Sequence, residues 1–369
     1  MEIIHVVLGK ANPARMNGVN KVVHELASHQ ALFGEHVTLW GISGSTVHDY
    51  PARPFSTRLF KTQAKLFALD PDLLLALDEK KEGTVFHLHG GFIPTFYALA
   101  KVLHERNIPF VFTPHGSYNV IAIKRSILRK KVYLRLYERT ILKYAQAIHC
   151  LGKSEMDGVQ QLYPNNKSVL IPYGFETDVT MHAHADAGAF VFGFCGRIDI
   201  YTKGLDLLLN AFFLFLKEEP SAELWIIGDS PDRLYLQELA TDLDIDRNIS
   251  FYGGKYGDEK LDLLSRIHVF VHPSRNEGLP SAVLEAASLG IPCIVTEATN
   301  MGASVRQYGC GEVVDHPDAK ELFAAMRTMY KNIRQNGMEV LGEKARCMVR
   351  EGYDWNRILQ YYHQLYRRA

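Results

Sequence analysis

The sequence predicts two α/β domains, each built on a parallel β-sheet covered by helices, and three observations support this fold class. The chain has 369 residues, and a prior of about 150 residues per domain predicts two domains. Apolar, β-branched segments alternate with helical segments in both halves, which is typical of parallel sheets. Residues 175–189 lack a periodic apolar pattern and are the best linker candidate. We therefore place the domains at 1–174 and 190–352, followed by a final segment at 353–369.

The first half contains six predicted strands and the helices that connect them. A helix at about 18–33 follows the first strand, a helix near 93–106 follows the third, and a basic helix follows the fourth. Residues 51–65 are low in pattern and are interpreted as a loop. The strands are the segments EIIHVVL, EHVTLWG, TVFHLHG, PFVFTPHG, AQAIHCL and SVLIPYG.

The second half repeats this order of strands and helices. This order again implies a parallel sheet covered on both faces. The final residues, 355–368, look helical. The strands are the segments FVFGFCG, ELWIIGD, ISFYGG, VFVHPS, PCIVTE and GEVVD.

Composition and charge exclude several classes of function. Lys+Arg and Asp+Glu are equal at 41 each, so no overall field favours nucleic acid. The five cysteines form no C-x-x-C pair and look like reduced core residues of a cytosolic protein. The amino terminus, MEIIHVVLGK, has no basic region before its apolar run and reads as a strand rather than a signal peptide. The apolar stretch 205–216 is too short to span a bilayer. These features predict a cytoplasmic location.

Two carboxylates separated by seven residues, Glu277 and Glu285, flank a predicted helix start. Pro280 suits a first helical turn and Gly290 suits the position after a helix end, so the helix is predicted at 281–289. The strand VFVHPS precedes it, which places Glu277 at the carboxyl end of a strand, where open α/β sheets bind ligands.

The start of this helix is a predicted anion site. Backbone N–H groups of Gly278, Leu279 and Ser281 would point at an anion. Two acceptor-only carboxylates on either side of that anion suit hydroxyl groups that flank a phosphate. A sugar nucleotide has this layout.

A second motif, FVFGFCGRIDIYTKG, places two cations near the same kind of strand end. Arg197 follows an apolar strand, and Lys203 precedes a predicted helix. Such cations can clamp a diphosphate. The alternative is a pair of ordinary surface cations.

Together the two motifs resemble those of the retaining GT-B glycosyltransferases of family 4, which carry an E-x7-E motif. The resemblance implies a GT-B fold of two Rossmann-like domains facing across a cleft, with the last segment crossing back to the first domain. It implies transfer of a hexosyl unit from a UDP- or GDP-sugar to a glycan or lipid-linked acceptor, in bacterial cell-surface polysaccharide or glycolipid synthesis. No cofactor is expected, because the nucleotide sugar is a substrate.

The resemblance and the motifs give each site residue an expected role. Glu277 would hold hydroxyls of the donor sugar, and Glu285 the ribose. Arg197 and Lys203 would stabilise the charge that develops on the leaving diphosphate. The expected catalytic residues are His115, Arg197, Lys203 and Glu277, and the expected donor-binding residues are Gly18, Arg197, Lys203, Glu277, Gly278, Leu279 and Glu285.

The first domain is expected to supply Gly18 and His115. Gly18 stands between the first strand and a helix and would let a phosphate approach the backbone. The family usually has a glycine pair here, and Asn17 replaces the first glycine. His115, in TPHGSYN, falls on the family's HG motif, so the resemblance implies that its imidazole faces the transferred sugar. A satisfied loop histidine is the alternative.

Three metal-like patterns are interpreted without a metal. The D-x-D runs at 242–246 lie between a helix and a strand, at the amino end of that strand, and read as a solvated turn. His87 and His89 alternate along a strand and share one face, but no third ligand is near in sequence, which favours core packing or acceptor contact. The pair at 182–184 lies in the predicted linker. We therefore predict a metal-independent enzyme.

The segment 121–145 carries eight basic residues against Glu138 alone. At about 100° per residue most of them share one side, while apolar residues on the other side can pack on the sheet. The basic side, from Lys124 to Lys143, suits an anionic membrane surface, which would make the enzyme peripheral on the inner membrane face. A solvated helix is the alternative.

Two other functions fit the same two-domain frame. One is a GT-B epimerase or phosphorylase, and a phosphorylase would release sugar phosphate rather than a nucleotide. The other is a catalytically silent subunit that binds a nucleotide sugar.

Overall fold

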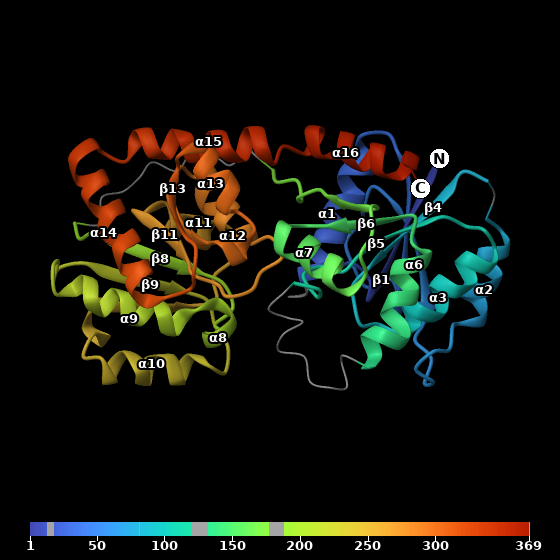
Figure 1. Cartoon of the computed structure of the whole chain (residues 1–369), viewed down its shortest axis with the longest axis horizontal. Coiled ribbons are helices and arrows are strands. Elements are labelled where there is room, and N and C mark those ends of the chain that lie inside the picture. Colours follow the sequence, from blue (N-terminus) through green and yellow to red (C-terminus); the bar gives the residue numbers. More distant parts are fainter. Residues whose placement is uncertain (13–17, 81, 120–131, 177–187, 369) are drawn as a thin grey trace. The chain divides into compact units, whose positions relative to one another are not determined.

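The structure, a computed structural model, describes residues 1–12, 18–80, 82–119, 132–176 and 188–368 (Figure 1). It forms two compact units. Unit 1 contains Met1–Gly174 and Trp355–Ala369, and unit 2 contains Phe175–Asp354. Each unit is built on its own parallel sheet, so the predicted α/β fold class is confirmed.

The sheet of unit 1 has the strand order β3-β2-β1-β4-β5-β6-β7. All neighbouring strands are parallel. The order reverses between β1 and β4, and the carboxyl ends at such a reversal are where open α/β sheets bind ligands. The strands are β1 (Glu2–Leu8), β2 (His36–Ser43), β3 (Ser56–Lys61), β4 (Thr84–His89), β5 (Phe110–Thr113), β6 (Ala147–Cys150) and β7 (Ser168–Leu170).

Helices from both ends of the chain pack on this sheet. The carboxyl-terminal helix, α16 (Trp355–Arg368), buries Ile358, Leu359 and Leu365 in one cluster with β-strand residues of unit 1. Gly174 makes room for this packing, because a Cβ there would lie 2.2 Å from the ring of Trp355. The other helices described in this unit are α1 (Gly18–Leu32), α2 (Pro71–Asp78), α3 (Pro94–Glu105), η1 (Leu134–Glu138), α6 (Arg139–Tyr144) and α7 (Lys153–Leu162).

The interpretation of residues 51–65 as a loop is wrong in part. Strand β3 lies within this range, pairs with β2 in parallel, and is followed by α2. Only Phe60 of β3 is buried, because the strand lies at the sheet edge. An edge strand of polar sequence lacks the apolar run by which the other strands are recognised.

The sheet of unit 2 has the order β10-β9-β8-β11-β12-β13, again with every neighbouring pair parallel. Its reversal lies between β8 and β11. The strands are β8 (Val191–Cys195), β9 (Glu223–Ile227), β10 (Ile249–Gly253), β11 (Val269–His272), β12 (Cys293–Thr296) and β13 (Gly311–Val314).

Helices follow most of these strands. The helices are α8 (Ile200–Lys203), α9 (Leu205–Leu216), α10 (Arg233–Asp242), η2 (Asp246–Asn248), α11 (Gly257–Ser265), α12 (Ser281–Ser288), η3 (Glu297–Thr299), α13 (Gly302–Tyr308), α14 (Ala319–Asn336) and α15 (Glu339–Gly352).

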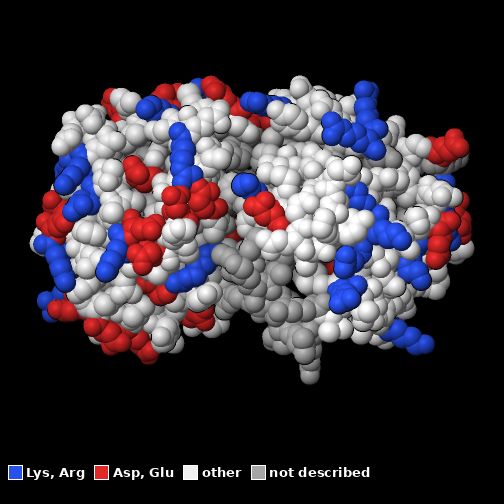
Figure 2. Space-filling model, viewed as in Figure 1, with Lys and Arg blue, Asp and Glu red and all other residues white. Residues whose placement is uncertain are grey.

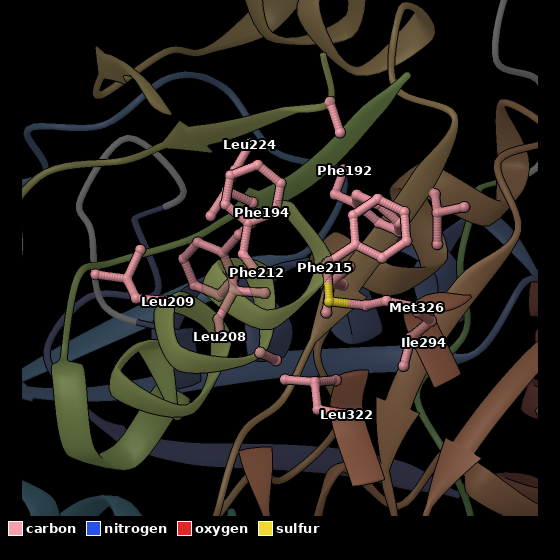
Figure 3. Close-up of a cluster of buried hydrophobic side chains, with 14 of the residues drawn as sticks. Phe192, Phe194, Leu208, Leu209, Phe212, Phe215, Leu224, Ile294, Leu322 and Met326 are labelled. Atoms are coloured by element: carbon pink, nitrogen blue, oxygen red, sulfur yellow. The ribbon is translucent and has the colours of Figure 1, made fainter. Parts of the chain in front are cut away.

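An aromatic core fixes the elements on either side of the Arg197–Lys203 segment. Phe192 and Phe194 of β8 and Phe212 and Phe215 of α9 are fully buried in one cluster, which α14 closes with residues such as Met326 (Figure 3). Each such side chain stabilises the fold by about 1.5–3 kcal/mol. The loop between β8 and α9 therefore starts and ends on rigid elements.

All five cysteines are free thiols, and Cys150, Cys195, Cys293 and Cys310 are buried. Among the described helices, none is both long and apolar enough to cross a membrane. Acidic and basic side chains are interspersed on the face of unit 2 that Figure 2 shows.

The basic segment falls largely outside the described residues, which resume at 132. Of the part that is described, Leu134 and Ile141 are buried, as predicted for the face that packs on the sheet, while Leu136 is exposed. Glu138, the single acid of the segment, is buried, which the helical plot does not predict. A π-helical turn at η1 shifts the register of the residues that follow it.

Candidate active site

Lys203 and Glu277 meet at the strand reversal of unit 2. Lys203 ends α8 after strand β8, and Glu277 lies in the loop after β11. Because β8 and β11 are adjacent and parallel, their carboxyl ends lie at the same sheet edge. Lys203 Nζ donates to Glu277 Oε1, and both side chains are largely buried.

Backbone contacts hold the loop that carries Glu277. The side chain of Asn300 donates to the carbonyls of Glu277 and Gly278 at 2.9 and 2.7 Å. The Glu277 N–H donates to the carbonyl of Ala298 at 3.1 Å. Helix α12 then begins at Ser281, directly after Leu279 and Pro280. The loop is preorganised at a positive helix end, where an anion is favoured.

The pKa of Glu277 falls although the side chain is buried. Burial by itself raises the pKa, but the hydrogen bond from His272 at 3.0 Å and the charge of Lys203 outweigh it and hold the pKa at about 2. Burial lowers the pKa of His272, so its ring donates to Glu277 as a neutral imidazole. Glu277 is therefore a carboxylate at neutral pH, which suits an acceptor of sugar hydroxyl groups.

A third contact ties the loops after β8 and β11 together. Arg275 forms a bidentate pair with Asp206 at 2.7 Å for both bonds, and its N–H donates to the carbonyl of Thr202. Gly204 has φ of 68° and sits against Pro273, whose carbonyl oxygen would lie 2.1 Å from a Cβ. Only glycine combines this backbone conformation with this close approach. The position of Lys203 against Glu277 is thus fixed from both sides.

Glu285 lies on α12 and pairs with a different cation. Lys260 of α11 donates to Glu285 Oε2 at 2.7 Å, and both side chains are largely buried. The two carboxylates of the motif are therefore each neutralised by one lysine. Sequence reasoning missed Lys260, His272 and Arg275. Lys260 reaches Glu285 from another helix and Arg275 reaches Asp206 across 69 positions, whereas His272 lies five residues before Glu277 and reads as part of the apolar strand.

Arg197 and Lys203 differ in environment. The Arg197 side chain is 67% exposed and contacts Asp199 at 3.4 Å, whereas Lys203 is 18% exposed. The role of Arg197 at a diphosphate stays a prediction.

In unit 1, Gly18 is the first residue of α1 and is exposed; Asn17 lies outside the described residues. Sequence reasoning missed Gly9 and Asn20 as holders of the preceding turn. The buried Asn20 accepts from the N–H of Ala11 at 2.8 Å and donates to the carbonyl of Leu8 at 3.1 Å. A Cβ on Gly9, which has φ of 110°, would lie 2.6 Å from Asn20 Oδ1.

His115 follows β5 with its backbone in the left-handed region, at φ of 54°. Both ring nitrogens take part in hydrogen bonds: Nδ1 with the Tyr173 hydroxyl and Nε2 with His89 Nδ1 at 2.9 Å. Burial, followed by the charge of His149, lowers the pKa of His115 to about 3. The imidazole is therefore neutral and held in one orientation.

The structure places the three metal-like patterns in different surroundings. The D-x-D runs lie between the end of α10 and η2, before β10, at the predicted sheet edge. The pair at 182–184 lies outside the described residues. His87 and His89 are joined by His5 of the neighbouring strand, and a ligating atom of each lies within 4.8 Å of the others. The sequence does not reveal His5 as a neighbour of His87, because the two residues are brought together by the pairing of β1 with β4.

Comparison with known proteins identifies this architecture. Residues 16–179 match the model described as Glycosyltransferase Family 4, and residues 182–348 match Glycosyl transferases group 1. The two units have the GT-B fold of glycosyltransferases. The chain belongs to glycosyltransferase family 4.

The chain is similar to an uncharacterized glycosyltransferase of Methanocaldococcus jannaschii, with 26% identity over 60% of this chain and 64% of that protein. The match thus spans less than two thirds of that relative. The GDP-mannose:cellobiosyl-diphosphopolyprenol alpha-mannosyltransferase of Xanthomonas oryzae is 27% identical over 85% of this chain and 83% of its own.

Among solved structures, Anabaena HepE in complex with UDP superposes with a TM-score of 0.76 at 15% identity, covering 99% of both chains. At this identity the superposition shows the fold alone.

Proposed function

We propose that the chain is a retaining glycosyltransferase that moves a hexosyl unit from a UDP- or GDP-sugar to a glycan or lipid-linked acceptor. The observation that carries the proposal is the pair of largely buried carboxylates at the β11–α12 edge, each bound to one lysine. Glu277 and Glu285 flank the start of α12, and the donor phosphates would lie between them.

Lys203 is assigned to the leaving diphosphate. In the structure it neutralises Glu277, and in the donor complex it would share its three donors between that carboxylate and a phosphate oxygen. The acceptor oxygen forms a bond to the anomeric carbon, the bond from that carbon to the diphosphate breaks, and the acceptor proton passes to the departing phosphate oxygen. Stabilising the charge on that oxygen is the main catalytic contribution.

The other assignments rest on position and on the family. Glu277 accepts from hydroxyls of the sugar, Glu285 from the ribose, and His115 faces the sugar as a neutral imidazole. Gly18, with Gly278 and Leu279, offers backbone close to the phosphates.

Relatives support a nucleotide-sugar donor and leave its base open. HepE is described in complex with UDP, and the Xanthomonas relative is named for GDP-mannose and a diphosphopolyprenol acceptor. A lipid-linked acceptor would place this chain at the inner membrane face through its basic segment, Lys124 to Lys143. Cations at the phosphates make a divalent ion dispensable in this proposal.

The test is a panel of nucleotide sugars, measured first by thermal shift and then by nucleotide release in the presence of acceptors, with and without chelator. We expect a single donor to raise the melting temperature by mass action and to support release of UDP or GDP in excess chelator. Release of sugar phosphate from glycan and inorganic phosphate would indicate a phosphorylase. Donor binding without release with any acceptor would indicate a silent binding subunit.

A further inference from the structure

Unit 1 buries four histidines side by side, and a fifth, His115, is partly buried next to them. His5 lies on β1, His87 and His89 on β4, His149 on β6, and His115 follows β5. Their proximity follows from parallel pairing, since β1 and β4 align His5 with His87. Burial is the largest cause that lowers the pKa of each ring, so all five are neutral at working pH. A neutral imidazole donates from one nitrogen and accepts at the other.

One chain of hydrogen bonds in this cluster has a fixed direction. His149 Nε2 contacts the carbonyl oxygen of Ile171 at 2.7 Å, and a carbonyl can only accept. His149 Nδ1 must therefore accept from the Thr113 hydroxyl, and Thr113 must accept from His87 Nε2. His87 Nδ1 then accepts from the hydroxyl of Tyr366 on α16. The tautomers of His87 and His149 are thus determined.

A second chain reaches His115, and its direction is set at its far end. His115 Nε2 lies 2.9 Å from His89 Nδ1, and His89 Nε2 lies 2.8 Å from His5 Nδ1. His5 Nε2 lies 2.6 Å from the side-chain oxygen of Gln30, which is fully buried. With that oxygen as the acceptor, His5, His89 and His115 each carry the proton on Nε2. His115 Nδ1 then accepts from the hydroxyl of Tyr173.

The groups at the two ends of this series of hydrogen bonds exclude net proton transport along it. An amide neither takes up nor releases a proton at working pH, so a proton that entered at His115 would have no exit at Gln30. The chain can fix an orientation and a tautomer, which is how partners behind a reacting group usually act. The backbone is fixed as well: Glu155 accepts from the N–H groups of Gly116 and Leu151.

We propose that Gln30, His5 and His89 are positioning residues that select the Nε2–H tautomer of His115 and aim its ring. The inference rests on the proposed function, in which His115 faces the donor sugar. Both ring nitrogens of His115 are engaged by His89 and Tyr173, so the tautomer acts through these two bonds: a single tautomer holds the ring in one orientation toward the sugar, and a mixture of tautomers would loosen it. Gln30, three hydrogen bonds away from His115, therefore acts on the site without contacting it.

The test is nitrogen NMR of the protein labelled with ¹⁵N-histidine, combined with steady-state kinetics. In the wild type we expect His5, His89 and His115 to share the Nε2–H tautomer. Gln30→Leu removes the acceptor that sets the direction, so His115 should become a mixture of tautomers. Turnover should fall on the order of tenfold, the effect of one lost neutral hydrogen bond, with donor KM nearly unchanged. Gln160→Leu is the matched control, because Gln160 binds Asn165 in the same unit.

Tyr173→Phe keeps the inference testable if Gln30→Leu does not fold. This variant removes the hydroxyl at the other end of the chain, and His115 should keep its tautomer because His89 still accepts from it. Loss of the tautomer in Tyr173→Phe, or an unchanged tautomer and turnover in Gln30→Leu, overturns the proposal.

Metal analysis separates the inference from a three-histidine site. One equivalent of zinc in the purified protein, lost in His5→Ala, would show that His5, His87 and His89 are ligands and would overturn the hydrogen-bonded chain. If no nucleotide sugar supports transfer by the wild type, the proposed function fails. The histidine tautomers measured by NMR still show whether the hydrogen bonds from Gln30 to His115 run in the proposed direction.

Discussion

Two carboxylates with little exposure, one in each unit, show how differently the units hold their polar groups. Glu277 of unit 2 has a pKa of about 2, whereas Glu138 of unit 1 has a pKa raised to about 8. Burial raises the pKa of both, but Glu277 receives bonds from Lys203 and His272, while Glu138 is held by the Tyr118 hydroxyl and the N–H of Phe92. The partners, and not the depth of burial, decide the charge.

The same difference extends to the surroundings of each site. Unit 2 places paired ions at its strand reversal, whereas unit 1 places neutral imidazoles and hydroxyls there. Paired ions can exchange a carboxylate for a phosphate on the same lysine, and neutral groups suit the hydroxyls of sugars. The two units therefore offer different chemistry at their strand reversals.

The largest expected difference between the units is in their stability at acid pH, where unit 1 should unfold first. Burial lowers the pKa of His5 to about 4, of His115 to about 3 and of His149 to about 4. The unfolded chain binds these protons near pH 6.5, so the stability they contribute is present above pH 6.5 and is lost as the pH falls toward the folded values. At ~1.4 kcal/mol per pKa unit, unit 1 should lose several kcal/mol between pH 6.5 and 4.

Hydrogen exchange with peptide resolution, at pH 7, 6 and 5 with rates corrected for pH, measures this loss in each unit. In unit 2, the contribution of Glu277 is lost only below about pH 4.5. Burial also lowers the pKa of His272, which adds a loss of the same sign as that of the unit 1 histidines, so we expect unit 2 to lose protection but less than unit 1. Equal loss of protection in both units would contradict the comparison.

The second effect is catalytic and lies in unit 2. Lys203→Ala should reduce turnover by about 10², the scale of removing one stabiliser of developing charge. Lys255→Ala is the control, since Lys255 forms an exposed pair with Glu259. Nucleotide release under saturating donor gives both values, and near-normal turnover in Lys203→Ala would place the phosphates elsewhere.

The third effect concerns alkaline pH in unit 1. The raised pKa of Glu138 means that its stability contribution is present below about pH 4.5 and is lost as the pH rises through about 8. Glu138→Gln should therefore flatten the fall in stability between pH 6 and 8, by on the order of 1–2 kcal/mol. Urea midpoints at the two pH values test this. A wild type as stable at pH 8 as at pH 6 would refute the assignment.

The last comparison is of nucleotide binding, where the expected change is the smallest, and it distinguishes the two carboxylates of the motif. Glu285→Ala should weaken binding of free UDP or GDP about tenfold, the loss of one charge-assisted hydrogen bond, while Glu277→Ala should spare nucleotide binding and abolish transfer. Calorimetry with the nucleotide compares them. The reverse pattern would exchange the assignments to ribose and sugar.

Local patterns in the sequence predicted what local physics determines. The apolar strands, the helix after Pro280 and the position of Glu277 at a strand end follow from neighbouring residues. Edge strand β3 was not predicted because its sequence is polar. The role of Lys260 was not predicted because this residue reaches Glu285 from another helix. The chain from Gln30 to His115 depends on strand register, which no local pattern specifies.

The position of α16 in the sequence has a consequence for synthesis. Unit 1 buries Ile358, Leu359 and Leu365, and His87 receives its hydrogen bond from Tyr366, yet these residues are translated after all of unit 2. At a translation rate of ~10 residues per second, the helix that covers the sheet of unit 1 is made about 20 s after the first 174 residues. Unit 1 therefore completes its fold only after unit 2 has been translated, and a premature stop after residue 354 would leave unit 2 intact and the sheet of unit 1 uncovered.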